Sequence, residues 1–116
     1  MATIYFLKTC DTCLKILKQL DTAAFILQDI KTNPITAAQL EEMYKRSKSY
    51  EALFSRRAKK FSQMDLKNQQ LTEIDYKQLI LADYTFLKRP VVINGDKIFI
   101  GNSKKTVDDL VEAYGK

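Results

Sequence analysis

An apolar run that leads directly into two closely spaced cysteines is the feature that most constrains this chain. Ile4–Leu7 has the composition of a short strand, Cys10 and Cys13 follow it, and the leucines at positions 14, 17 and 20 have helical spacing. This pattern predicts that a strand ends and a helix begins at the cysteines. Because the free N–H groups and the positive dipole end of a helix stabilise an anion, we expect Cys10 to be more acidic than an ordinary thiol.

Three charged residues flank the cysteine pair. Lys8 and Lys15 favour a thiolate at Cys10, whereas Asp11 opposes it. We therefore interpret Cys10 as a nucleophile and Cys13 as its resolving partner, and we count Lys15 among the candidate substrate-binding residues.

Two other interpretations of the pair have to be weighed. A structural zinc site usually has four ligands, so two cysteines and no histidine would require carboxylates or a second chain. Two buried, inert cysteines are the other alternative, because free cysteine often behaves as a small hydrophobic residue. The strand-then-helix setting favours a redox-active dithiol over both. The lack of histidine also excludes Cys-His proteases and Ser-His hydrolases. We expect neither a metal nor a tightly bound cofactor.

The length and composition indicate one ordinary globular domain. The chain has 116 residues, of which 46% are hydrophobic and 28% charged. It contains no apolar run long enough to span a membrane and no recognisable signal peptide, so we expect a cytoplasmic protein without membrane contact. The net charge of +5 is concentrated between Lys45 and Lys67. This basic stretch matches no DNA-binding motif, and direct contact with nucleic acid is not expected.

The order of expected elements is β-α-β, a helical segment, and then β-β-α. Thr36 with Gln39 and Thr72 with Asp75 are typical of helix starts, and Asn94-Gly95 indicates a hairpin turn. The remaining elements are expected at about 3–7, 11–20, 24–30, 91–93 and 97–100, and a last helix is expected after a cap at Ser103, with its apolar stripe over 107–114. We predict a thioredoxin-like α/β fold with a mixed four-stranded sheet, in a single domain over residues 1–116 with a helical insertion at about 35–87.

Three stretches, taken together, resemble the arsenate reductase family, the group that contains ArsC, Spx and YffB proteins. They occur in the family's order and spacing over essentially the whole chain: Cys10-Asp11-Thr12-Cys13, Leu53-Phe54-Ser55-Arg56-Arg57 and Leu87-Lys88-Arg89-Pro90-Val91-Val92-Ile93.

The resemblance implies roles for individual residues. Cys10 matches the family's catalytic cysteine, and Arg89 matches an arginine that contacts the substrate oxyanion or thiolate. Arg57, or Arg56 if the register differs by one, matches a second arginine, and Pro90 matches a cis proline beside the active cysteine. Planar guanidinium groups suit a tetrahedral oxyanion and lower the pKa of a nearby thiol. The chain departs from the best-studied reductases in two ways: residues 97–102 contain no arginine, and Cys13 stands where a serine is common.

The resemblance also implies two alternative functions. The first is a thiol-dependent oxidoreductase that reduces arsenate or a disulfide, such as a glutathione mixed disulfide, with glutathione, glutaredoxin or thioredoxin as reductant. The second is a redox-sensing regulator similar to Spx, in which a Cys10–Cys13 disulfide changes the affinity for RNA polymerase. Nothing in the sequence indicates an oligomer, and we expect a monomer.

Overall fold

The computed structural model describes residues 2–116, which form two compact units. The sheet unit combines the chain up to Pro34 with Arg89–Lys116, and the helical unit is Ile35–Lys88. The prediction of one domain over residues 1–116, with a helical insertion at about 35–87, stays a prediction. The two units are described one at a time below.

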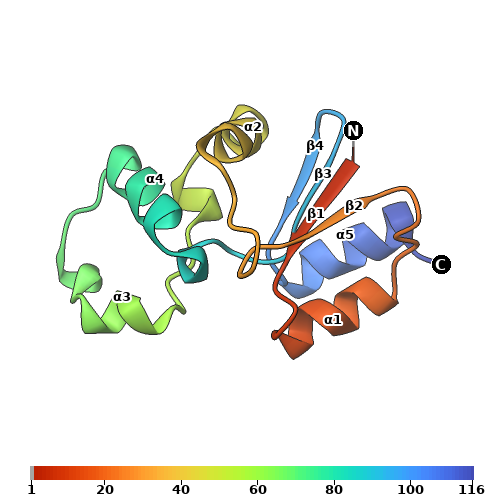
Figure 1. The fold of residues 1–116 in the computed structure, drawn as a ribbon, viewed down its shortest axis with the longest axis horizontal. Helices are drawn as coiled ribbons and strands as arrows, with labels where there is room; N and C mark the ends of the chain where they lie inside the picture. Colours follow the sequence, from red (N-terminus) through yellow and green to blue (C-terminus); the bar gives the residue numbers. More distant parts are fainter. Residues whose placement is uncertain (1) are drawn as a thin grey trace. The chain divides into compact units, whose positions relative to one another are not determined.

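The sheet unit contains the four-stranded mixed sheet that the sequence predicts. Its strands are β1 (Ala2–Phe6), β2 (Ile26–Asp29), β3 (Val91–Asn94) and β4 (Lys97–Ile100), in the order β2-β1-β3-β4. β1 pairs parallel with β2 and antiparallel with β3, and β3 pairs antiparallel with β4 (Figure 1). The thioredoxin-like fold class is therefore confirmed, with β1 and β3 in the centre of the sheet.

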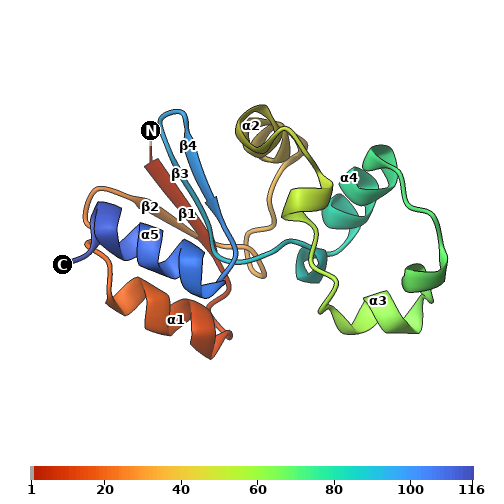
Figure 2. The ribbon, with the colours of Figure 1, turned by 180° about the vertical axis from the view of Figure 1, so that it is seen from behind.

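Both helices of this unit, α1 (Asp11–Lys18) and α5 (Lys104–Tyr114), lie on the same face of the sheet (Figures 1 and 2). They share one apolar core with the strands, in which five side chains are buried: Ile4, Ile16, Leu20, Val92 and Leu110. Ile4 and Val92 are paired across β1 and β3, so their side chains point to one face and meet the helices there. This packing holds α1 and α5 against the sheet.

The end of α1 is also tied to the end of α5. The Asp21 N–H donates to the Tyr114 carbonyl at 2.8 Å, and the Lys116 N–H donates to the Gln19 carbonyl at 3.1 Å. The Tyr114 ring packs edge-on against Phe25 and Phe99, with ring centroids 5.2 and 5.6 Å apart.

Two local expectations differ from the structure. The run 24–30 predicts a strand that is apolar on both faces, but β2 lies at the sheet edge, where Ile26 and Leu27 are 50% and 47% exposed. The hairpin forms, yet Asn94 pairs with Lys97, so its two-residue loop is Gly95-Asp96 and not Asn94-Gly95. Gly95 has a φ of +61°, which places the glycine at the first loop position.

The helical unit has three α-helices and three short 3-10 helices within the described chain. They are α2 (Ala37–Ser47), η1 (Glu51–Leu53), α3 (Lys59–Gln63), η2 (Leu66–Asn68), α4 (Glu73–Ala82) and η3 (Tyr84–Phe86). Both predicted helix starts are confirmed as reciprocal capping boxes, formed by Thr36 with Gln39 and by Thr72 with Asp75.

Phe54 is the centre of the aromatic packing in the helical unit. Its fully buried ring stacks on Phe86 at 5.1 Å between centroids and contacts Tyr76 at 4.9 Å and Phe61 at 6.0 Å. A backbone hydrogen bond links the residues next to these rings: the Ser55 N–H donates to the Phe86 carbonyl at 2.7 Å.

None of the helices formed by residues 2–116 combines the length and the apolar character needed to cross a membrane.

Candidate active site

Cys10 lies at the junction between the first strand and the first helix. β1 ends at Phe6, the Cys10 N–H donates to the Leu7 carbonyl at 3.0 Å, and the Cys10 carbonyl accepts the Leu14 N–H of α1 at 3.1 Å. Cys10 is therefore the N-cap residue of α1, with extended backbone angles. Its half-buried thiol lies at the start of the helix, where the backbone N–H groups of Thr12 and Cys13 in the first turn can stabilise a thiolate.

The surroundings of Cys10 favour its thiolate. Burial raises the pKa of the Cys10 thiol, but hydrogen bonding by the Cys13 backbone and side chain and by the Thr12 backbone outweighs that effect. The positive charge of Arg89 acts in the same direction, and the pKa of Cys10 lies below its ordinary value. The lowered pKa that the position at a helix N-terminus predicts for Cys10 is thus found in the structure. Arg89 is the charged residue that contributes to it.

Cys13 has the opposite character, although it lies only three residues further along the chain. It is fully buried on the inner side of α1, and both cysteines are free thiols. Burial, followed by the charge of Cys10, raises the pKa of Cys13 to about 11. Cys13 is therefore protonated at neutral pH, and its S–H can donate a hydrogen bond to the Cys10 thiolate.

Arg89 and Pro90 reach the same end of the sheet from the other end of the chain. β3 begins at Val91, which pairs with Tyr5 near the end of β1. The peptide bond between Arg89 and Pro90 is cis, Arg89 is half-buried and Pro90 is buried. The charge of Arg89 acts on both thiols, so Cys10, Cys13 and Arg89 form one electrostatic cluster in the sheet unit.

Two polar residues that the sequence did not single out hold the backbone around this cluster. Asp29, the last residue of β2, accepts the Lys8 N–H at 3.2 Å, two residues before Cys10. The Asn102 side chain donates its Nδ2 to the Arg89 carbonyl at 3.1 Å. Asp29 ends a strand and Asn102 precedes a helix cap, and both residue types are common in turns. No sequence pattern therefore indicates these two hydrogen bonds, which only the fold reveals.

Lys15 lies in the last turn of α1 with an exposed side chain. Its contribution to substrate binding stays a prediction.

The two candidate arginines of the helical unit have different environments. The Arg56 guanidinium donates to Glu51 Oε2 at 2.7 Å and to the Tyr76 hydroxyl at 3.0 Å, and it lies 5.7 Å from the centroid of the Tyr76 ring. Arg57 is exposed, and its guanidinium makes no hydrogen bond or ion pair with any other part of residues 2–116. Of the two, Arg57 is the arginine that is available to an external anion.

Known proteins similar to this chain share its fold over nearly the full length. The model of the ArsC family matches residues 5–110. A "possible arsenate reductase" from Streptococcus mutans is 26% identical, with a TM-score of 0.74 over 95% of this chain and 97% of that one. No curated protein matches the chain.

Two further solved structures are similar in fold. A protein named "YFFB" has a TM-score of 0.78 and 23% identity, covering 96% of this chain and 99% of its own. An arsenate reductase from Vibrio cholerae has a TM-score of 0.76 and 14% identity, covering 96% of this chain and 95% of its own.

Proposed function

The chain belongs to the ArsC family, and from this membership we propose that it is a thiol-dependent reductase of arsenate or of a disulfide such as a glutathione mixed disulfide. The observation that carries the proposal is the Cys10 thiol, which lies at the start of α1 with a lowered pKa beside Cys13 and Arg89. A thiolate is the nucleophilic form of cysteine, and the lowered pKa makes this form more abundant at Cys10 than at an ordinary thiol.

In the first step, the Cys10 thiolate attacks the oxidised substrate. With arsenate, an S–As bond forms and an oxygen leaves as water after protonation. With a glutathione mixed disulfide, Cys10 takes the glutathione, and the released thiolate picks up a proton. Arg89 supports either reaction, because its positive charge stabilises both an oxyanion and a departing thiolate.

In the second step, another thiol attacks the intermediate. With arsenate, this thiol attacks the Cys10 sulfur, a disulfide forms on Cys10, and the arsenic leaves as arsenite with the two electrons of the S–As bond. With the mixed disulfide, glutathione attacks the sulfur of the bound glutathione, so that glutathione disulfide forms and the Cys10 thiolate is released. Attack is fastest for a thiol whose pKa is near the ambient pH. Cys13 is buried, with a pKa of about 11, which favours an external thiol such as glutathione here. After arsenate reduction, glutathione, glutaredoxin or thioredoxin reduces the disulfide on Cys10 and restores its thiol.

We assign the second anion-binding arginine to Arg57. Arg56 already has a carboxylate, a hydroxyl and an aromatic ring as partners, and an anion would have to displace them. Arg57 is exposed and not engaged by residues 2–116. The two residues are adjacent, chemically identical and differ in their partners, so they form a matched pair for mutagenesis.

The decisive experiment is steady-state reduction of arsenate and of a glutathione mixed disulfide, with glutathione plus glutaredoxin and then thioredoxin as electron donors. We expect turnover that Cys10→Ser abolishes while the fold is retained. Arg57→Ala should raise KM for arsenate several-fold, and Arg56→Ala should leave KM nearly unchanged while lowering stability slightly, as loss of an exposed ion pair does.

Turnover that persists in Cys10→Ser would contradict the proposal. If no combination of substrate and donor gives turnover, yet mild peroxide still forms a Cys10–Cys13 disulfide, the redox-sensing alternative gains weight. Binding of the reduced and oxidised protein to RNA polymerase would then be measured.

A further inference from the structure

Asn102 contacts the backbone of the candidate site from the turn that follows β4, at the same end of the sheet as Arg89. Its side-chain Nδ2 lies 3.1 Å from the Arg89 carbonyl oxygen, and the side chain is partly buried. The acceptor is the carbonyl of the peptide bond that joins Arg89 to Pro90. That bond connects the arginine of the thiol cluster to strand β3.

The residue before Asn102 makes a second bond to the same segment. The Gly101 N–H donates to the Pro90 carbonyl at 2.9 Å. Gly101 has a φ of +83°, a conformation that a residue with a Cβ adopts only at a cost, so the turn depends on glycine here. Consecutive residues of one turn therefore hold the consecutive carbonyls of Arg89 and Pro90.

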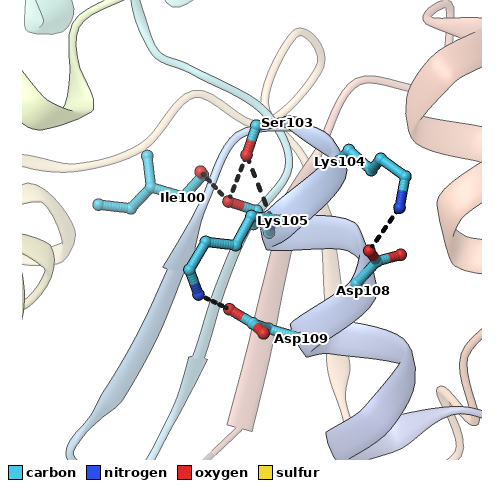
Figure 3. Close-up of polar contacts among 7 residues, drawn as sticks. Ile100, Ser103, Lys104, Lys105, Asp108 and Asp109 are labelled. Atoms are coloured by element: carbon cyan, nitrogen blue, oxygen red, sulfur yellow. Dashed lines mark hydrogen bonds and ion pairs between the residues drawn. The ribbon is translucent and has the colours of Figure 1, made fainter.

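The residues that follow Asn102 are held by the start of α5. Ser103 is the N-cap, and its Oγ accepts the Thr106 N–H at 3.2 Å. The Thr106 hydroxyl bonds to Ser103 Oγ at 2.9 Å and lies 3.4 Å from the Ile100 carbonyl (Figure 3). The turn 101–103 is thus fixed on one side by β4 and on the other by α5, whose Leu110 is buried in the core.

A firmly held Asn102 can restrict where Arg89 lies. The positive charge of Arg89 contributes to the lowered pKa of Cys10 and partly offsets the burial that raises the pKa of Cys13. A charge–charge interaction weakens as the separation grows. Arg89 precedes the strand and has the long, flexible side chain of its residue type, so a fixed backbone carbonyl limits the positions that its guanidinium samples.

We propose that Asn102 is a positioning residue, whose side-chain amide holds the Arg89 backbone so that the guanidinium stays beside the Cys10 thiol. This inference rests on the proposed role of Cys10 and Arg89, but it concerns thiol reactivity and does not depend on which substrate is reduced. Asn102 acts through Arg89 and has no contact of its own with a substrate in this assignment.

The test is a double-mutant cycle on the full chain, with the rate of Cys10 alkylation by iodoacetamide measured against pH. We expect Asn102→Ala to lower the rate at pH 7 by about twofold to tenfold, the range that corresponds to one ordinary hydrogen bond. In the Arg89→Ala background, Asn102→Ala should have no further effect. Asn102→Ser is the second variant, since it keeps a polar turn residue whose shorter side chain does not span to the Arg89 carbonyl.

Ser103→Ala is the matched control. It removes the α5 cap next to Asn102 without touching Arg89, so it should lower the free energy of unfolding and leave the pH profile of Cys10 unchanged. The inference is overturned if Asn102→Ala and Asn102→Ser leave the alkylation rate unchanged, or if the loss persists undiminished without Arg89. It is also overturned if Ser103→Ala slows alkylation as much, because general loosening of the turn would then account for the effect. Arsenate turnover does not enter these outcomes.

Discussion

Two cysteines three positions apart differ in chemistry because one caps a helix and the other faces the core. Cys10 lies at the helix N-terminus with a lowered pKa, whereas burial raises the pKa of Cys13 to about 11. The same residue type thus provides a nucleophile at one position and a protonated hydrogen-bond donor at the other. In this arrangement Cys13 contributes to reactivity even when it does not itself form a disulfide.

This difference predicts the effect of removing the Cys13 thiol. Cys13→Ala removes an S–H donor to the Cys10 thiolate, so the pKa of Cys10 should rise and its alkylation at pH 7 should slow several-fold. Cys13→Ser is the control, because a hydroxyl can still donate and should preserve most of the reactivity. The pH dependence of alkylation measures both variants. Equal rates for the alanine variant and the unmodified protein would show that Cys13 does not stabilise the thiolate.

The residue scale also shows how far the sequence could identify the candidate site. Cys10 could be found because its chemistry follows from local order, a strand followed at once by a helix. Arg56 and Arg57 could not be distinguished, because one partner of Arg56, Tyr76, is twenty residues away in the chain. Asn102 was missed for the same reason: its acceptor lies thirteen residues earlier and is a backbone atom that no residue pattern marks.

At the scale of helices and strands, the predictions that rest on residues close together in the sequence were confirmed. The predictions that depend on which strands pair with each other were less accurate. Both capping boxes lie within four residues of sequence and formed as predicted. The run 24–30 predicts a strand mostly apolar on both faces, but strand order depends on distant pairing, and β2 lies at an edge, where Ile26 and Leu27 are about half-exposed. The hairpin loop moved by one residue because the pairing of β3 with β4 puts Gly95 at the first loop position.

The last helix gives a prediction at this scale. Leu110 is fully buried among the core residues shared by α1, α5 and the sheet, so Leu110→Ala should lower the free energy of unfolding by about 2–5 kcal/mol. Val111→Ala on the same helix is the control. Its side chain is 36% exposed, and the change should stay within about 0.5 kcal/mol. Denaturant unfolding measures both, and similar losses for the two variants would show that α5 does not anchor the core as described.

At the scale of the whole molecule, the sheet unit is built from the two ends of the chain and the helical unit from the middle. Strands β1 and β3 pair side by side although the entire helical unit lies between them in sequence. The helical unit is the entire connection between Pro34 and Arg89. If it unfolded, the sheet unit would have to close a long flexible loop, at an entropic cost of the order of 3 kcal/mol.

This connectivity predicts that the two units share their stability, in line with the single domain expected from the sequence. Phe54→Ala, which removes the centre of the aromatic packing in the helical unit, should destabilise that unit by about 3–5 kcal/mol. It should also lower the protection of the Ile4 amide in β1 against hydrogen exchange, because closing the sheet depends on an ordered insertion. Ile74→Ala, at a site 66% exposed in the same unit, should change neither. If Phe54→Ala speeds exchange only within 35–88 and leaves β1 protected as before, the units unfold independently and the chain consists of two domains.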